Sequence, residues 1–186
     1  MKFMGRFGVS ALALACAVSA LAQRDPTRDN YLGVEAGVYF PTDPTIRDVF
    51  GTSVAKVGFN YGNFGRQADK WRLTGNFNFI SANKDGSRFF LVPVTAAVGR
   101  MFGQPGDNSR PYVRVGAGLA YMDYSVEVSS VDRRRARKIL PTAGAEVGVV
   151  IGDRLRLAGT YNWFAETDGL DFTGFQLTLG YSLIRF

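Results

Sequence analysis

The sequence has 186 residues, a formal net charge of +6, one cysteine and no histidine. Without histidine it cannot carry a Ser-His or Asp-His catalytic pair, and a lone cysteine excludes an intrachain disulfide. Hydrophobic residues make up 46% of the chain, which is long enough for one domain with its own core.

The first 22 residues (1–22) have the composition of a secretory signal peptide. Lys2 and Arg6 precede the apolar run Val9–Ala22, which ends in the small-residue sequence Ala-Leu-Ala. The run is shorter than the roughly 20 residues of a membrane-spanning helix, which disfavours a retained anchor. A lipoprotein signal at Cys16 is disfavoured because the residues before it stand in the wrong order. We therefore predict one mature domain over 23–186, with a net charge of about +4 and no cysteine.

Apolar and polar residues then alternate with a period of two along the rest of the chain. Such alternation is typical of half-buried strands, and helical periodicity is nowhere convincing. Turn residues separate the alternating runs. The predicted strands cover residues 30–40, 53–64, 71–80, 88–102, 112–122, 141–151, 155–163 and 173–186. Eight antiparallel strands with short connections predict an all-β, up-and-down barrel without an open edge.

The distribution of glycine indicates which face of the barrel looks inward. The polar face carries eleven glycines, at positions 33, 37, 58, 62, 99, 116, 118, 144, 148, 174 and 180. The crowded inside of a narrow barrel needs positions without side chains, whereas a solvent-facing surface does not. We therefore expect a transmembrane barrel with its apolar face in lipid. The alternative is a soluble lipocalin-like cup with its apolar face inside.

Aromatic residues gather near the two ends of the apolar band. In a membrane-embedded barrel, such girdles lie at the lipid-water interfaces. Ordinary core aromatics at strand ends are the alternative interpretation. The predicted lower girdle comprises Tyr31, Tyr61, Trp71, Phe102, Tyr112, Tyr181 and Phe186, and the upper girdle comprises Tyr39, Phe40, Phe79, Phe89, Phe90, Tyr121, Trp163 and Phe175.

The segments YLGVEAGVYFP, PYVRVGAGLAYM and LTLGYSLIRF carry a resemblance to a known family. The chain resembles the small eight-stranded outer-membrane β-barrels related to OmpA, OmpX and OmpW. The resemblance implies that the last strand, with Tyr181, Leu183 and Phe186, is the signal read by the barrel-assembly machinery. The apolar parity through Leu183 is opposite to that of Ile184 and Phe186, so a bulge must be allowed near this end.

Charged residues of the polar face are predicted to meet inside the barrel. They are Glu35, Lys56, Arg72, Arg114, Glu146 and Arg156. Because a bare charge is costly in a lumen of low dielectric constant, we expect a network of hydrogen-bonded ion pairs that fills the barrel. The alternative is a narrow pore that favours anions, since four cations face two carboxylates.

Catalysis is not expected. The membrane-barrel hydrolases and acyltransferases of similar architecture use a histidine, and this sequence contains none. The two predicted lumen carboxylates lie among cations, which lower a carboxyl pKa rather than raise it as a general acid requires. We predict no cofactor and no metal site.

A basic cluster stands out in the third of the outward-facing loops. Loops after odd-numbered strands are predicted at 41–52, 81–87, 123–138 and 164–171, and the shorter periplasmic turns at 65–70, 103–110 and 152–154. The cluster comprises Arg133, Arg134, Arg135, Arg137 and Lys138. It could bind lipopolysaccharide phosphates or acidic surface polymers through guanidinium contacts, or be only a solvated loop. Nucleic acid is not expected, because no aromatics interleave these cations.

The sequence thus predicts a monomeric barrel in outer-membrane lipid with a structural or surface-interaction role, such as adhesion or envelope integrity. A narrow pore and a secreted ligand-binding barrel are the alternatives.

Overall fold

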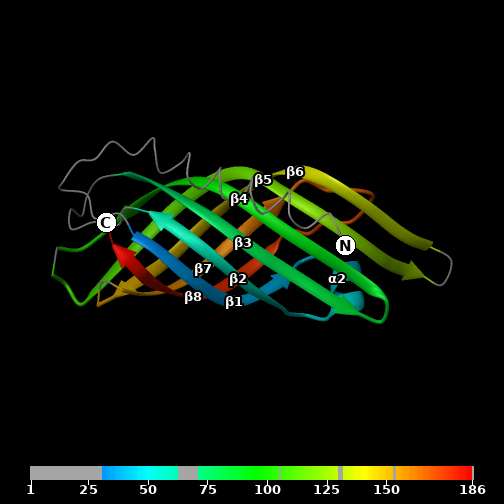
Figure 1. Ribbon diagram of the computed structural model, residues 1–186, viewed down its shortest axis with the longest axis horizontal. Coiled ribbons are helices and arrows are strands. Elements are labelled where there is room, and N and C mark those ends of the chain that lie inside the picture. The colour runs from blue at the N-terminus through cyan, green and yellow to red at the C-terminus, as the bar shows by residue number, and fades with distance from the viewer. Residues whose placement is uncertain (1–30, 63–70, 105, 130–131, 153, 186) are drawn as a thin grey trace.

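The eight alternating segments form strands that pair antiparallel around a closed ring (Figure 1). The computed structural model describes residues 31–62, 71–104, 106–129, 132–152 and 154–185. Within them the strands are β1 (Tyr31–Pro41), β2 (Val54–Gly62), β3 (Arg72–Lys84), β4 (Ser87–Met101), β5 (Ser109–Ser129), β6 (Asp132–Ile151), β7 (Leu155–Phe164) and β8 (Gly174–Arg185). Pairing of β8 with β1 closes the sheet, which confirms the predicted barrel. The predicted signal peptide lies outside the described residues.

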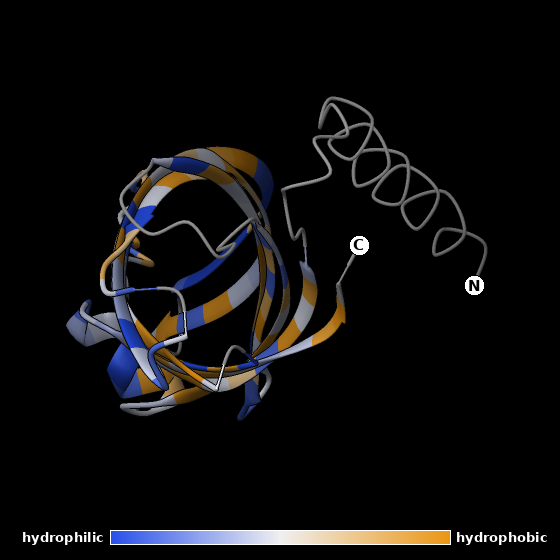
Figure 2. Cartoon of the chain, turned by 90° about the vertical axis from the view of Figure 1, so that its left-hand side faces the viewer, coloured by the Kyte–Doolittle hydropathy of each residue, from blue (hydrophilic) through white to orange (hydrophobic). Residues whose placement is uncertain are grey.

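The two faces of each strand meet opposite surroundings, as the alternating colours of Figure 2 show. Outward-facing Val57, Leu73, Val115, Val147, Leu157 and Leu179 are each more than half exposed. Their sequence neighbours Lys56, Thr74, Arg114, Glu146, Arg156 and Thr178 are buried inside. An apolar outer band with polar residues inside is the arrangement of a barrel in lipid, so the lipocalin-like alternative is wrong.

Glycine at selected inward positions allows close contact between neighbouring strands. A Cβ on Gly118 would lie 2.0 Å from the Val94 carbonyl oxygen, and one on Gly37 would lie 2.1 Å from that of Leu177. Both distances are far below van der Waals contact, so a side chain there would force the strands apart. The glycine pattern therefore reflects crowding inside the barrel, as predicted from the sequence.

One end of the barrel interior is filled by apolar side chains, which we call the apolar plug. The short helix α2 (Pro44–Phe50) contributes Ile46 and Phe50 to it. Phe89 lies with its ring 4.9 Å from that of Phe50 and 5.5 Å from that of Phe172. The plug comprises Tyr39, Ile46, Phe50, Val54, Ile80, Phe89, Leu91, Ala120, Met122, Tyr124, Val126, Phe164, Leu170 and Phe172. Burial of each large apolar side chain stabilises the fold by about 1.5–3 kcal/mol.

Four aromatics assigned to the girdles lie inside the barrel instead. Tyr39 and Phe89 belong to the apolar plug, whereas Tyr31 and Tyr112 pack together at the other end of the lumen. Their place in the strand explains the error. Tyr39 is an even number of residues from Glu35, and Tyr112 from Arg114, so each must face inward with that charge.

The remaining described girdle residues keep the predicted outward parity. Among them Trp71, Trp163 and Tyr181 are exposed, and Phe79 packs with Phe90 at a ring distance of 6.2 Å. The other members are Phe40, Tyr61, Phe102, Tyr121 and Phe175. Phe186 lies outside the described residues. The outward aromatics thus remain a predicted interface anchor, in a smaller set.

Two predicted loops are mostly strand. Residues 123–138 continue β5 and β6 into a long hairpin, in which Asp123 pairs with Arg137 and Glu127 with Arg133. In Figure 1 this hairpin extends past the ends of the other strands. The segment 81–87 is also strand, apart from a tight turn at Asp85 and Gly86, whose φ values of 50° and 77° suit a hairpin turn. The strand alternation continues through both segments, but it was not recognised because the segments contain few apolar and many charged or polar residues.

The change of parity near the end of β8 is accommodated by a bulge. Leu32 pairs with Ile184 and Gly33 with Ser182, so Leu183 has no partner in β1. Both Leu183 and Ile184 are consequently exposed. The sequence had predicted such an irregularity, while the role of this strand as an assembly signal stays a prediction.

Candidate functional site

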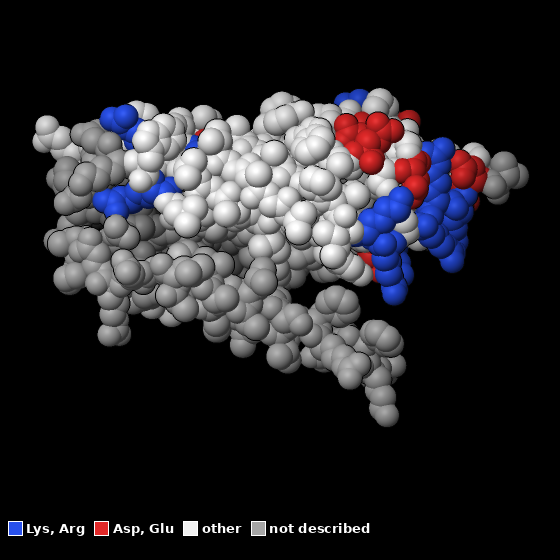
Figure 3. All heavy atoms as spheres, turned by 90° about the horizontal axis from the view of Figure 1, so that it is seen from above, with Lys and Arg blue, Asp and Glu red and all other residues white. Residues whose placement is uncertain are grey.

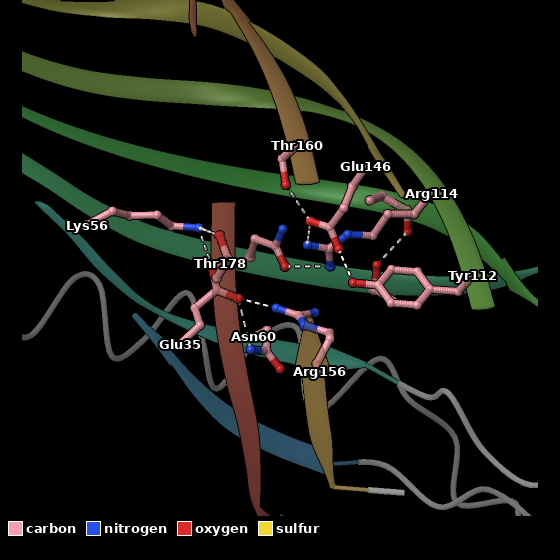
Figure 4. A network of polar contacts seen from close by, with 12 residues as sticks. Glu35, Lys56, Asn60, Tyr112, Arg114, Glu146, Arg156, Thr160 and Thr178 are labelled. Carbon is pink, nitrogen blue, oxygen red and sulfur yellow. Dashed lines mark hydrogen bonds and ion pairs between the residues drawn. The ribbon is translucent and has the colours of Figure 1, made fainter. Parts of the chain in front are cut away.

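Glu35 is the centre of one polar cluster in the lumen (Figure 4). Its Oε1 lies 2.6 Å from the Lys56 ammonium, which also donates to Thr178 Oγ1 at 3.2 Å. Its Oε2 accepts from Asn60 Nδ2 at 3.0 Å and from the Arg156 guanidinium. β1, β2, β7 and β8 supply these residues, so the carboxylate ties together the strands on both sides of the barrel closure.

Glu146 organises a second cluster beside the first (Figure 4). It forms an ion pair with Arg114, accepts from the Tyr112 hydroxyl at Oε1 and accepts from Thr160 Oγ1 at 2.9 Å. Arg114 also donates through Nη1 to Asn76 Oδ1 at 2.7 Å. Both oxygens of this buried carboxylate accept hydrogen bonds, which offsets the cost of burying its charge.

Five of the six predicted lumen charges meet in these two clusters. Arg72 forms no ion pair with the residues that the structure describes, and its buried Nε has no hydrogen-bond partner among them. The clusters also contain neutral partners that were not predicted from the sequence: Asn60, Asn76, Tyr112, Thr160 and Thr178. Each of them lies an even number of residues from an inward-facing residue on its strand, and this spacing could have predicted them. These ion pairs and their neutral partners occupy the lumen of the barrel.

The basic cluster of the hairpin divides by strand parity into two sets. Arg134 and Lys138 lie on the inward-facing side of the hairpin. Lys138 Nζ lies 2.8 Å from Asp168 Oδ1 and 2.7 Å from Thr167 Oγ1. Arg134 Nη1 donates to the Asp168 carbonyl at 2.7 Å, and the Tyr124 hydroxyl donates to the Asp168 carboxylate. We call these five residues the latch, because they join the hairpin to the β7–β8 connection.

The latch has a defined electrostatic signature. Hydrogen bonds from Lys138 and then Tyr124 hold the pKa of the Asp168 carboxyl below its usual value. Burial, followed by the hydrogen bond to Asp168, raises the pKa of Tyr124 to about 12. Both groups lie beyond the apolar band. The latch is therefore built around an ionised carboxylate and a neutral phenol at ordinary pH.

Arg133, Arg135 and Arg137 form the other set and face outward. Together with Arg88 they line a cleft of about 580 Å³, which we call the cationic cleft. The other lining residues are Gly86, Asp123, Tyr124, Ser125 and Ala136. Figure 3 shows Lys and Arg gathered with acidic residues at this end of the barrel, next to a broad uncharged band.

The outward cations differ in how they are neutralised. Arg137 Nε lies 2.9 Å from Asp123 Oδ2, and Arg133 Nη2 lies 2.6 Å from Glu127 Oε2. Arg135 donates only to a neutral group, Ser125 Oγ at 3.1 Å. Arg88 has no ion pair with any residue that the structure describes. The cleft thus retains two positive charges without carboxylate partners, which is suited to an anion.

No group of three metal-ligating side chains occurs among the described residues. Within the same part of the chain, no helix is long and apolar enough to cross a membrane.

A closed eight-stranded barrel with a polar lumen and an apolar outer band defines a transmembrane β-barrel of the outer membrane. The chain belongs to the outer membrane protein beta-barrel domain family, whose model matches residues 8–182. None of the curated proteins matches the sequence.

Solved structures share the fold at low sequence identity. Neisserial surface protein A is 13% identical with a TM-score of 0.59, covering 83% of this chain and 97% of its own. Ail of Yersinia pestis is 15% identical with a TM-score of 0.54, covering 86% and 99%. The outer membrane enzyme PagL is 13% identical with a TM-score of 0.56, covering 81% and 99%. These likenesses show the fold alone.

Proposed function

We propose that this outer-membrane barrel presents the β5–β6 hairpin to acidic surface polymers or lipopolysaccharide, with a structural or adhesive role. The observation that carries the proposal is the cationic cleft, where Arg88 and Arg135 have no carboxylate partner in the part of the chain that the structure describes. Guanidinium groups bind phosphate and sulfate in paired hydrogen bonds, and exposed arginines can do so without breaking the fold.

The proposal places the end with the apolar plug outside the cell. In outer-membrane barrels short turns face the periplasm and longer excursions face outward. The long β5–β6 hairpin and the helical β1–β2 connection both lie at the plug end, while β6 and β7 are joined at the other end by a tight connection. The hairpin would then project from the outer leaflet.

A barrel of this fold can engage a polyanion. Ail of Yersinia pestis has been solved in complex with the heparin analogue sucrose octasulfate, in a structure 14% identical to this chain with a TM-score of 0.50. That property belongs to Ail. Here the proposal of a polyanion partner depends on the arginines of the cleft, and Ail supplies a suitable probe.

We infer that the lumen does not conduct and that the protein is not an enzyme. The apolar plug fills one end, and the paired charges of the two carboxylate clusters fill the region below it. PagL shows that the fold accommodates an enzyme, but this sequence has no histidine and its two lumen carboxylates are engaged by cations. The narrow-pore alternative predicts discrete conductance steps in planar bilayers, and we expect silent bilayers instead.

Titration with sucrose octasulfate of the protein refolded in neutral nanodiscs tests the proposed function. Replacement of Arg133 and Arg135 by serine should weaken binding at least about tenfold, because the loss of Arg135 alone removes a charged hydrogen bond that contributes about 1.5–3 kcal/mol. The matched control is R47S/K84S, which removes two exposed cations outside the cleft and should bind like the wild type. Equal affinity of both variants would contradict the proposal.

A further inference from the structure

We propose that the cationic cleft binds the phosphorylated headgroup of an outer-leaflet lipid, with the lipid's acyl chains lying on the barrel directly below. This inference rests on the proposed function and narrows it: the anion is part of the membrane around the barrel. The shared chemistry is phosphate or sulfate held by guanidinium groups. The source that we favour is a glycolipid, because the cleft of about 580 Å³ has room for a sugar phosphate.

The pairing of β4, β5 and β6 sets the outward side chains in rows across three strands. The register fixes these rows, each two residues along the strand from the next, or about 7 Å. From the membrane upward they are Val92–Tyr121–Ile139, then Phe90–Asp123–Arg137, then Arg88–Ser125–Arg135. The surface therefore changes from apolar to mixed to cationic within three rows of one continuous strip.

The cationic row contains the two arginines that form no ion pair with a described carboxylate. Ser125 pairs with Arg88 on one side and with Arg135 on the other. Since neighbouring strands lie about 4.8 Å apart, the backbones of the two arginines are separated by about 10 Å. Both side chains are long enough to converge on one anion above the Ser125 hydroxyl, as in a bidentate phosphate site.

The neighbouring rows differ in a way that favours this position. Arg137 and Arg133 already contact Asp123 and Glu127 at ion-pair distance, so an anion there would compete with a carboxylate. An anion that binds between Arg88 and Arg135 does not have to displace a carboxylate. An incoming phosphate would neutralise two charges that the described residues leave unpaired.

The apolar rows below supply the reason to choose a lipid. Ile139 is 67% exposed and Leu119 is 57% exposed, and both lie on the strip beneath the cleft. Figure 3 shows the uncharged band reaching the charged end without a break. A soluble polyanion would use the cations only. A molecule with an anionic head and apolar chains would use the cations and the band together.

Binding of lipid A tests the proposal in nanodiscs of phosphatidylcholine that contain fluorescently labelled lipid A or its dephosphorylated form. Energy transfer from the protein reports bound lipid, and the heat-dependent gel shift confirms that each variant is folded. The wild type should retain lipid A at least about tenfold better than the dephosphorylated lipid. R88S/R135S should lose this preference, whereas the matched control R47S/K84S should keep it.

A soluble competitor separates the lipid from a free polyanion. Sucrose octasulfate should displace lipid A from the wild type only at high concentration, because it lacks acyl chains. If sucrose octasulfate binds through Arg88 and Arg135 while lipid A shows no preference, the lipid inference is wrong and the proposed function stands. If neither probe binds above the R88S/R135S variant, both are wrong.

Discussion

Basic side chains occur in two regions of this barrel with opposite surroundings. In the lumen, the side chains of Lys56, Arg114 and Arg156 are at most 5% exposed, and each reaches a carboxylate. On the outward side of the hairpin, Arg135 is exposed and donates to the Ser125 hydroxyl, and it forms no ion pair with a described residue. The same residue type thus holds the fold together where it is buried and paired, and is available to a ligand where it is exposed.

The largest difference should appear when one carboxylate is removed from each region. Glu146→Ala leaves Arg114 buried without its partner and should cost about 3–5 kcal/mol of unfolding free energy. Glu127→Ala breaks only the exposed pair with Arg133 and should cost less than about 1 kcal/mol. Urea unfolding of the lipid-embedded protein, followed by the heat-dependent gel shift, measures both. Similar losses for the two variants would refute the distinction between lumen and hairpin.

The two faces of the hairpin should respond differently to the loss of two positive charges. R133S/R135S alters the outward face and should weaken sucrose octasulfate binding about tenfold. R134S/K138S removes the same number of charges from the latch and should leave the affinity within about twofold, since neither residue lines the cleft. Calorimetric titration distinguishes the two. A larger loss of affinity for R134S/K138S than for R133S/R135S would mean that the outward face of the hairpin is not the binding face.

A smaller effect is expected from the pH dependence of the latch. The pKa of Asp168 is lower in the folded protein than its ordinary value of 3.8. Its contribution to hairpin stability is therefore complete above the ordinary value and is lost as pH falls through the lowered one. Hydrogen exchange of the hairpin amides should be constant near neutral pH and accelerate only in strong acid. In the Asp168→Asn variant, the hairpin amides should exchange faster even at neutral pH. Unchanged exchange would mean that the latch does not stabilise the hairpin.

Strand alternation was sufficient to predict the closed barrel and most of the lumen. Glu35 and Glu146 could be placed inside because each lies on a face rich in glycine. Tyr39 and Tyr112 resemble girdle residues by type, but each lies an even number of positions from an inward charge, Glu35 or Arg114, and therefore faces inward. The apolar plug could not be predicted from one strand at a time, because Phe50 and Phe172 reach it from connections between strands.

The hairpin was the least predictable part of the site. A run of arginines has the composition of a solvated loop, and the partners that order it come from other segments. Arg88 contributes to the cleft from β4, and Asp168 to the latch from the β7–β8 connection. The helix α2 was missed because it has only seven residues, although Asp43 before Pro44 is a recognisable start.

Titration of sucrose octasulfate into the nanodisc-embedded protein, with wild type, R133S/R135S and R47S/K84S compared, tests directly whether the outward arginines bind an anion. We expect saturable binding by the wild type and the control, and at least about tenfold weaker binding by the cleft variant. Binding that is absent from the wild type, or that falls equally in both variants, would contradict the claim that the outward arginines of the hairpin form an anion site.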